Sequence, residues 1–436
     1  MTDPQIGALA IGILFVLIAL RVPIAVALTG VPFFGIWYLI NFKAAVGALK
    51  VIPYSFAANW LLSSVPMFLL MGYLAYHTGI TKGLFNAARI WLARLPGGLA
   101  IASIMGASGF AAVTGSSVAC AAAMGRIAVP EMLKSRYDPG LATGTVAAAG
   151  TIGALIPPSI LFIIYGIIAV VPIGDLFLGG AIAGLMTAVS YVVVILIRAK
   201  LDPSLAPPVE EVYSWRQRLA VLAEISPILL LAVLVFGGLF GGLFTATEAG
   251  AVGASLCAII AFFQGGLTWN SIKISISETI TTTAAIFVIA IGANLLGRFV
   301  AISQADAWIS DLINLFASDF VLLMIAIVVL YLILGMFLDP LGAMLLTLPI
   351  LLPVMREQGL DLLWFGIILA KLLEIGMITP PVGLNVFVLK SVLGNAVPIG
   401  TIFKGVTYFL LADLVIVILL IAFPQIVLYL PEVLNR

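Results

Sequence analysis

Long apolar runs separated by short polar segments extend along the whole chain. Runs of roughly 20 residues match the apolar thickness of a bilayer when they are helical, and they are too long for the strands of a membrane barrel. The pattern therefore predicts an all-α polytopic membrane protein. The uninterrupted runs cover 5–20, 22–40, 62–79 and 176–198 in the first half of the chain, and 224–242, 246–264, 280–299 and 403–424 in the second.

Four further apolar segments carry glycine, proline or small polar residues near their middle. Two of them, 97–133 and 320–355, are long enough to enter a membrane, turn and leave on the same side, so they predict re-entrant helical hairpins. The other two, 140–170 and 361–389, predict spans whose helix is broken part-way. Each half of the chain then has five transmembrane spans and one re-entrant hairpin, in the same order.

The two halves also resemble each other in sequence. A shift of 223 residues places the interruptions of the second half on those of the first, which predicts two structural repeats, 1–198 and 219–436, joined by a cytoplasmic linker over 199–218. Because five crossings is an odd number, the second repeat is inverted relative to the first. The superposed residues are Pro353 on Pro130, Met355 on Met132, Ile375-Gly376 on Ile152-Gly153, and Pro380-Pro381 on Pro157-Pro158.

Composition agrees with a membrane protein and excludes other classes. Of the 436 residues, 63% are hydrophobic and 9% are charged, whereas roughly a quarter are charged in soluble domains. The net charge of +1 gives no field that would attract nucleic acid, so membrane lipid is the expected surrounding. A single histidine excludes a multi-histidine metal site. The chain offers no acid–base set, so we expect neither an enzyme nor an organic cofactor.

Basic residues indicate the orientation in the membrane. With the linker on the cytoplasmic side, fourteen of the 20 Lys and Arg residues fall inside and six outside, in agreement with the positive-inside rule. Both termini then lie outside, the first hairpin opens from the inside, and the second opens from the outside. Two amphipathic stretches, 83–95 and 301–318, precede the hairpins, and we expect them to lie in opposite interfaces as hinged arms.

The first hairpin is interrupted by a short polar segment. Glycine permits a non-helical turn, and unwound backbone at membrane depth needs a partner in protein, water or an ion. Carbonyl and hydroxyl oxygens at a helix break suit Na⁺. The alternative is a small-residue face for helix packing. The segment is Thr114-Gly115-Ser116-Ser117.

The two broken spans carry interruptions at equivalent places. Interrupted spans in matching positions of two halves are the best sequence indication of a midplane binding site in a secondary transporter. For either span alone, a simple proline kink is the alternative. The interrupting residues are Gly150, Thr151, Gly153 and Pro157-Pro158 in the first half, and Gly376, Thr379, Pro380-Pro381, Gly383 and Asn385 in the second.

Asp339 lies inside the second hairpin and aligns with Ser116 under the same shift. A carboxylate in an apolar hairpin is costly and functional by default, so we interpret Asp339 as a cation ligand, with a helix N-cap as the alternative. Arg298 is the candidate to pair with an anionic substrate, although snorkelling near a span end would also explain it. Three residues stay ambiguous between intramembrane pairing and a polar face: Lys371, Glu374 and Asp413.

These motifs resemble the large membrane subunit, often called the DctM type, of the tripartite ATP-independent periplasmic (TRAP) transporters. The resemblance extends over the whole chain. Val118-Ala119 stands where dicarboxylate-type members often have Pro-Ala, so no dicarboxylate is assigned. The matching segments are 114–117 through Pro130-Glu131-Met132, 156–159, 245–251 (with Ala246 where Pro is usual) and 379–385.

The resemblance implies a sodium-driven, elevator-type importer in a bacterial inner membrane, with both termini periplasmic. A periplasmic substrate-binding protein would deliver an organic acid, and two or more Na⁺ would be co-transported. A small four-span membrane subunit would support the scaffold, as a separate chain because nothing precedes Met1. One Na⁺ would bind Gly115, Ser116, Ser117, Gly150, Thr151, Gly153 and Pro157, a second would bind Asp339, Gly376, Thr379 and Gly383, and the substrate would lie near Thr114 and Asn385.

The main alternative is a stand-alone sodium/carboxylate symporter of the divalent-anion type, which works without a binding protein. Such a protein also uses re-entrant hairpins, but the SNT-like sequence of their tips is absent from this sequence. Transport that requires an added binding protein separates the two hypotheses. A channel is disfavoured, because polar stripes on several helices are not found.

Overall fold

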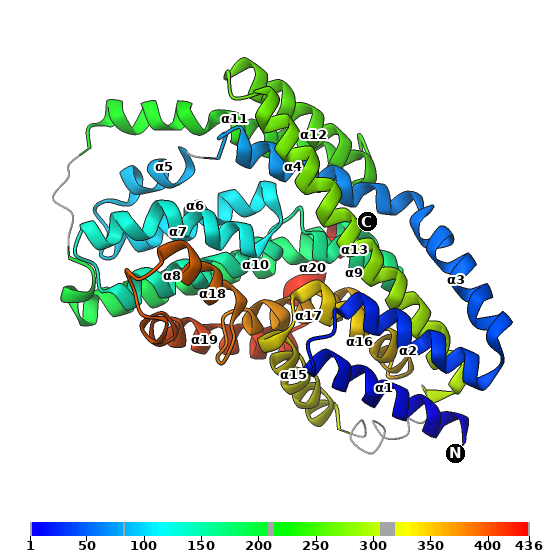
Figure 1. Cartoon of the computed structure of the whole chain (residues 1–436). Coiled ribbons are helices and arrows are strands. Elements are labelled where there is room, and N and C mark those ends of the chain that lie inside the picture. Colours follow the sequence, from blue (N-terminus) through cyan, green and yellow to red (C-terminus); the bar gives the residue numbers. More distant parts are fainter. Residues whose placement is uncertain (1, 82, 208–212, 306–318, 435–436) are drawn as a thin grey trace.

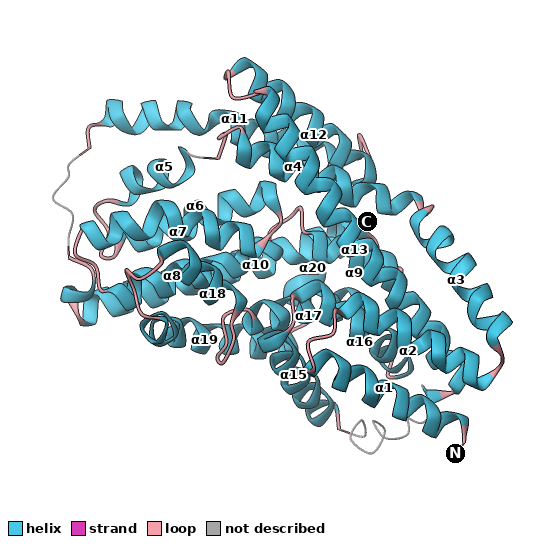
Figure 2. Ribbon diagram, viewed as in Figure 1, coloured by secondary structure: helices cyan, strands magenta, loops and turns pink. Residues whose placement is uncertain are grey.

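The computed structural model describes residues 2–81, 83–207, 213–305 and 319–434, and it shows a bundle of helices (Figure 1). No strand occurs among these residues (Figure 2). Seven of the described helices are long and apolar enough to cross a membrane, and eight qualify when one bent helix pair is counted as a single span. The prediction of an all-α polytopic membrane protein is confirmed.

Several helices of the first half begin at polar caps. The Ser116 hydroxyl accepts a bond from the backbone N–H of Ala119, and the Asp138 carboxylate accepts one from Leu141 at 2.7 Å. The elements are α1 (Asp3–Ala19), α2 (Ile24–Leu39), α3 (Phe42–Ala57), η1 (Trp60–Ser63), α4 (Ser64–His77), α5 (Gly83–Leu92), α6 (Gly98–Thr114), α7 (Ser117–Lys134), α8 (Pro139–Thr151), η2 (Ile152–Ala154), α9 (Ile160–Ala169), α10 (Ile173–Leu201) and η3 (Pro203–Leu205).

Several helices of the second half also begin at polar N-caps. Thr245 and Glu248 form a reciprocal capping box, and Asp361 accepts a bond from the N–H of Trp364 at 2.9 Å. The elements are α11 (Trp215–Phe240), α12 (Ala246–Phe263), α13 (Trp269–Ser303), α15 (Phe320–Phe337), α16 (Pro340–Glu357), α17 (Leu362–Gly376), α18 (Leu384–Leu393), α19 (Ile399–Ala422) and α20 (Gln425–Leu434).

Each segment predicted as a hairpin holds two helices separated by two residues. Gly115 and Ser116 separate α6 from α7, and Leu338 and Asp339 separate α15 from α16. A shift of 223 residues carries α15 and α16 onto 97–114 and 117–134, which match the bounds of α6 and α7 within one residue. The broken spans are α8–η2–α9 and α17–α18, each interrupted at a cis Pro–Pro bond.

The helices form two groups. The flanking group consists of α1–α4 and α11–α13, in which α2 packs on α13 and α4 packs on α12 and α13 (Figure 1). The central group consists of α6–α10 and α15–α20. Within it α8 crosses α19 so closely that a Cβ on Gly405 would lie 1.9 Å from the carbonyl oxygen of Gly140. Small residues thus permit the tight helix contact that membrane bundles use.

Some elements differ from the sequence-based expectation. The helices α3 and α20 were not predicted, since α3 carries Lys43, Lys50 and Pro53, and α20 is short. The stretch 83–95 contains α5, which packs on α6 and α11. Most of the stretch 301–318 lies outside the described residues. The helices α1 and α2 have 17 and 16 residues, so their crossing of the membrane stays a prediction, as do the inverted repeats.

Candidate functional site

The tip of the first hairpin lies directly against the first broken span. Gly115 has a left-handed backbone with φ +58°, and a Cβ there would lie 2.1 Å from the carbonyl oxygen of Pro158. A Cβ on Gly153 would lie 3.0 Å from the carbonyl group of Ser116. Glycine is required at Gly115, where the backbone is left-handed and a Cβ would clash, whereas at Gly153 a Cβ would make a tight contact that requires its neighbours to shift. The contact brings together Gly115, Ser116, Ser117, Gly150 and Gly153 of the first predicted sodium set.

Two other members of that set have different surroundings. The Thr151 hydroxyl donates to the carbonyl of Ala148 at 2.7 Å and lies 3.1 Å from the hydroxyl of Tyr191 in α10. This hydroxyl is therefore engaged on the face of α8 that meets α10. Pro157 is buried and forms the cis bond to Pro158.

The second hairpin places Asp339 at the start of α16. Its Oδ2 accepts a bond from the backbone N–H of Gly342 at 2.8 Å, so the N-cap is present. The same carboxylate lines a cavity between the hairpin tips. N-capping and cation binding are compatible, because an ionised carboxylate offers about four lone-pair sites.

The rest of the second predicted sodium set lies at the break between α17 and α18. A Cβ on Gly376 would lie 2.5 Å from the Cα of Gly335 in α15, so hairpin and broken span touch through glycine backbone. Gly383 has a left-handed backbone with φ +58°, whereas the Thr379 hydroxyl donates to the carbonyl of Ile375 within its own segment. The structure brings Gly376 against the hairpin and leaves the hydroxyl of Thr379 engaged locally.

A cavity of about 210 Å³ lies between the two hairpin tips. Ser116 and Ser117 reach it from the first hairpin, Asp339 from the second, and Glu374 from α17. Within the described part of the chain, the lining residues include these two carboxylates and no basic side chain. Intramembrane carboxylates pair with an opposite charge or mark an ion pathway, so the cavity favours a cation.

Glu374 was ambiguous from the sequence, and the structure places it at this cavity. Its side chain is 1% exposed, and Oε2 accepts a bond from the Ser117 hydroxyl at 2.6 Å. Oε1 has no hydrogen-bond partner among the described residues. The sequence signal was present, since an acidic residue interrupts an apolar helix just before its break, but nothing local identified Ser117 as its partner.

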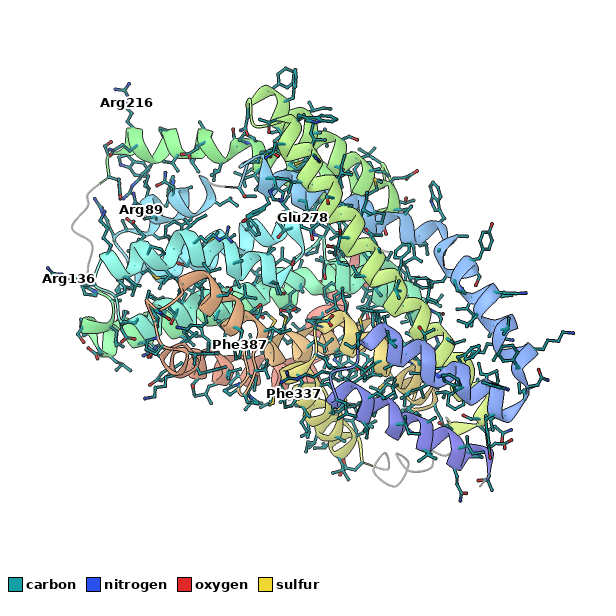
Figure 3. All side chains as sticks on the ribbon, viewed as in Figure 1. Arg89, Arg136, Arg216, Glu278, Phe337 and Phe387 are labelled. Atoms are coloured by element: carbon teal, nitrogen blue, oxygen red, sulfur yellow. The ribbon has the colours of Figure 1, made fainter. Side chains whose placement is uncertain are left out.

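A second buried polar cluster lies between α8, α10, α17 and α19. The Lys371 ammonium donates to Asp413 at 2.5 Å and to the Thr187 hydroxyl at 3.0 Å, and the side chains of Lys371 and Asp413 are 0% exposed. The other Asp413 oxygen accepts from the Tyr191 hydroxyl at 2.7 Å, and Tyr191 contacts Thr151. Most other charged side chains lie at the surface of the molecule. Arg136 and Arg216, for example, extend from one end of it (Figure 3).

Of the residues predicted to hold substrate, two lie around the first hairpin and Arg298 lies elsewhere. The Thr114 hydroxyl donates to the Phe110 carbonyl, and Thr114 lines a neighbouring cavity of about 180 Å³ with Ser116. Asn385 is fully buried, and its amide nitrogen lies 3.5 Å from the carbonyl of Ala147 in α8. Arg298 lines a separate cavity that also includes Arg356. Thr114 and Asn385 both lie near the first hairpin, because a Cβ on Gly150 would lie 2.9 Å from the amide nitrogen of Asn385 and 3.2 Å from the carbonyl oxygen of Ser117, whereas Arg298 lies apart.

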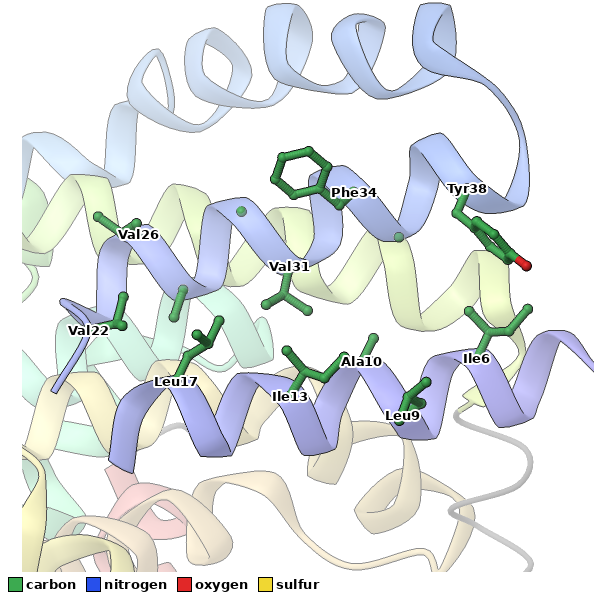
Figure 4. Close-up of a pocket in the computed structure, with 13 residues that line it drawn as sticks. Ile6, Leu9, Ala10, Ile13, Leu17, Val22, Val26, Val31, Phe34 and Tyr38 are labelled. Atoms are coloured by element: carbon green, nitrogen blue, oxygen red, sulfur yellow. The ribbon is translucent and has the colours of Figure 1, made fainter. Parts of the chain in front are cut away.

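A large hollow of the described surface is apolar and lies apart from these groups. It is a groove of about 580 Å³ between α1 and α2, where Leu9, Ile13 and Phe34 are among the lining side chains (Figure 4). Tyr38 contributes the only side-chain polar atom of its described lining. A surface of this kind offers no chemistry for an organic acid or a cation.

Polar oxygens gathered at paired helix interruptions inside an apolar bundle define a polytopic transporter of the secondary type. The chain matches the family model described as "Tripartite ATP-independent periplasmic transporter, DctM component" over residues 11–426. It therefore belongs to this family, and it is a large subunit of the DctM type. The resemblance noted in the sequence is confirmed.

Curated relatives agree with this assignment. The sialic acid TRAP transporter large permease protein SiaM of Vibrio cholerae is 33% identical over 86% of this chain and 87% of the relative. The C4-dicarboxylate TRAP transporter large permease protein DctM of Pseudomonas aeruginosa is 34% identical over 89% of this chain and 90% of the relative. The ectoine TRAP transporter large permease protein TeaC of Halomonas elongata is 30% identical over 86% and 87%.

The fold also has a solved counterpart. The YdaH transporter of Alcanivorax borkumensis superposes with a TM-score of 0.63 over 89% of this chain and 90% of that chain. The sequences are 16% identical, so the similarity concerns the fold alone.

Proposed function

We propose that this chain imports an organic acid across the bacterial inner membrane together with Na⁺. A periplasmic substrate-binding protein delivers the acid, and a small membrane subunit completes the transporter. The observation that carries the proposal is the cavity between the two hairpin tips, which holds Ser116, Asp339 and Glu374 and is lined by no basic side chain among the described residues. Such a site needs a cation before it accepts an anionic group.

The relatives indicate the class of substrate. Their names specify sialic acid, C4-dicarboxylates, isethionate and ectoine, all of which are small polar molecules with an acidic group. We propose an organic acid of this kind for the present chain. The stand-alone symporter of the divalent-anion type remains the alternative, and family membership supports the tripartite transporter.

For the movement, we propose an elevator in which the central group travels relative to the flanking group. The hairpins and broken spans contact each other through the backbone at Gly153 and Gly376, so each pair can move as one unit. The helix α5 packs on α6 of the central group and on α11 of the flanking group, as an arm between them would.

A charge-removing substitution at Asp339 tests the sodium coupling. Asn caps a helix about as well as Asp, so Asp339→Asn keeps the bond to Gly342 and removes only the charge. In proteoliposomes that contain the small subunit and the binding protein, we expect Asp339→Asn and Asp339→Ala to abolish uptake driven by a Na⁺ gradient, measured with radiolabelled acids of the classes above.

The matched control is Asp319→Asn. Asp319 caps α15 by accepting a bond from Val321 at 2.8 Å, but it is exposed and does not line the cavity. Its replacement should leave uptake unchanged. Wild-type uptake with unaltered sodium dependence in Asp339→Asn would show that this carboxylate is a cap only. Full uptake without any binding protein would favour the stand-alone symporter.

A further inference from the structure

Two neighbouring cavities at the boundary between the flanking and central groups contain arginine and no carboxylate among their described lining residues. We infer that they receive the anionic group of the transported acid before the acid reaches the hairpin tips, with Arg298 and Arg356 as the binding groups. The inference rests on the proposed function in taking an organic acid as the substrate. It adds a receiving site that lies apart from the hairpin tips.

The first argument is the surplus of positive charge. Arg298 of α13 and Arg356 of α16 both line a cavity of about 340 Å³, and neither forms an ion pair among the described residues. Arg356 donates from one Nη to the carbonyl of Ala169 at 3.2 Å, which orients its side chain. A guanidinium group has five N–H donors, so this bond leaves capacity for an oxyanion, which arginine binds with two parallel hydrogen bonds.

The second argument is that the two arginines come from opposite sides of the boundary. Asn294 and Arg298 lie one turn apart on α13 of the flanking group, whereas Arg356 lies in the last turn of α16 of the central group. The neighbouring cavity, of about 380 Å³, shares Asn294 and Arg298 and adds the polar side chains of Ser55 and Asn59. An anion bound here therefore contacts both groups.

The third argument is the position of this cavity relative to the hairpin tips. The helices α13 and α16 pack on each other. The cavity between the hairpin tips reaches Ile286 on α13 and Leu341 on α16, and the arginine cavity begins at Ala293 and Leu345 on the same two helices. The rise of an α-helix makes these intervals roughly 10 Å and roughly 6 Å. The two cavities therefore follow each other along one boundary, separated by one or two helical turns.

The predicted orientation places the arginine cavity on the side from which the acid arrives. The count of basic residues puts Arg298 and Arg356 outside, where a binding protein would deliver its ligand. Arg356 lies at the open end of the second hairpin, roughly 25 Å of helix away from Asp339 at the tip. An arginine that only snorkels extends to the lipid headgroups, whereas these two line a cavity between helices.

The size and the lining suit a small organic acid. A volume of about 340 Å³ falls within the roughly 300–1,000 Å³ of small-molecule sites. Leu348 and Leu352 provide an apolar wall beside the guanidinium groups. Positive charge at the mouth of such a site raises the local concentration of an anion and its rate of capture. A lipid phosphate has the same oxyanion chemistry, and the experiment below separates the two sources.

The test places a reactive cysteine in the wall of the cavities. Asn294 lines both of them, and the native Cys120 and Cys257 can stay because they are buried. The full-length chain carrying Asn294→Cys is reconstituted with the small subunit in phosphatidylcholine vesicles, and its rates of reaction with an anionic and a cationic methanethiosulfonate reagent are measured. We expect Arg298→Gln or Arg356→Gln to lower the ratio of the anionic to the cationic rate about tenfold.

Protection against the reagents identifies the ligand. Sialic acid, succinate and isethionate are added at millimolar concentration, and at least one of them should slow the reaction of Asn294→Cys. Arg298→Gln should abolish this protection, and in uptake assays with the binding protein it should raise the KM about tenfold at unchanged kcat. Vesicles that contain phosphatidylglycerol, assayed without acid, test whether a lipid phosphate protects instead.

Further variants control for charge and for folding. Lys43→Gln is the matched control, because Lys43 is an exposed cation of α3 that lines neither cavity, and its rate ratio and protection should equal those of the parent. Arg298→Lys keeps the charge and should retain most of the rate ratio. If Asn294→Cys does not fold, Ser55→Cys in the neighbouring cavity takes its place.

The outcomes separate this inference from the proposed function. An unchanged rate ratio in both arginine variants, or no protection by any of the acids, would overturn the inference even if the wild type transports an acid with Na⁺. Protection by phosphatidylglycerol alone would assign the cavities to a lipid phosphate and overturn it as well. Protection by an acid in a chain that shows no uptake driven by Na⁺ would support the receiving site and refute the proposed function.

Discussion

The ion pair between Lys371 and Asp413 allows the interior of the central group to be perturbed one charge at a time. Lys371 in α17 and Asp413 in α19 have side chains that are 0% exposed, with 2.5 Å between Nζ and Oδ1. Lys371→Met removes the ammonium and keeps an unbranched side chain. Asp413→Leu replaces the carboxylate with an apolar group. Each single substitution leaves one buried charge without its partner.

We expect each single substitution to lower the free energy of unfolding by about 3–5 kcal/mol, because it strands an uncompensated charge in the interior. The double substitution should be close to neutral. Its remaining neighbours keep partners, since the Tyr191 hydroxyl still has Thr151 at 3.1 Å and the Thr187 hydroxyl still donates to Ala183 at 2.8 Å. The expected coupling is several kcal/mol, well above the roughly 0.6 kcal/mol average for hydrogen bonds between membrane helices.

A double-mutant cycle measures this coupling. Unfolding is followed by tryptophan fluorescence in mixed micelles of dodecyl maltoside and increasing SDS, for the wild type, both single variants and the double variant. The control cycle uses Arg89 and Glu131, which lie 2.6 Å apart with side chains 25% and 32% exposed. Breaking that pair should cost about 1 kcal/mol or less, because solvent screens it.

The free energies of unfolding of the wild type, the two single variants and the double variant show whether Lys371 and Asp413 compensate each other. Additive losses in the double variant would refute the reasoning, because they would mean that the two charges do not compensate each other. A Lys371→Met variant as stable as the wild type would refute it as well, since Asp413 would then need no ammonium.

Two further predictions concern motion and orientation. In a background without the native cysteines, a disulfide between Gly72→Cys and Thr114→Cys, whose backbones approach at this contact, should stop uptake, and reduction should restore it. Undiminished uptake in the cross-linked protein would contradict travel of the hairpin tip past α4. For orientation, a cysteine at Lys50 should react with an impermeant thiol reagent from the periplasm and one at Pro207 should not, and the reverse pattern would invert the topology.

The sequence was sufficient for the helix breaks because their causes are local. Gly115 ends α6 through a left-handed turn, and Pro340 follows the Asp339 cap, so both hairpins are encoded within a few residues. The same local reasoning failed at α3, where two lysines and Pro53 lower the apolar signal of a helix that packs on α2 and α13. Tertiary packing stabilises that helix, and a single-segment pattern does not contain this information.

The partners of the buried polar groups could not be predicted, because they come from distant segments. Ser117 and Glu374 are 257 positions apart, and Lys371 and Asp413 are 42 positions apart. The sequence identified each charge as unusual at membrane depth, but only the packing of α17 on α10 and α19 shows which charges neutralise each other. The orientation of the Thr151 hydroxyl toward Tyr191 has the same origin.

The distribution of polar contacts gives physical support to the proposed movement. Except for the bond from Arg89 to Glu131, which joins α5 to α7, the hydrogen bonds between side chains of different helices described here join helices of one group. Gly72 of the flanking group instead meets the backbone of Thr114, where a Cβ on Gly72 would lie 3.0 Å from the Cα of Thr114. Sliding at such a contact exchanges one apolar or backbone surface for another and leaves no buried charge unpaired, so its cost is small. Breaking the hydrogen bonds within the central group would leave buried charges without partners. We therefore expect the central group to move as a rigid unit. The bonds in question join Ser117 to Glu374 and Lys371 to Asp413 in the central group, and Tyr73 to Thr282 and His77 to Glu278 in the flanking group.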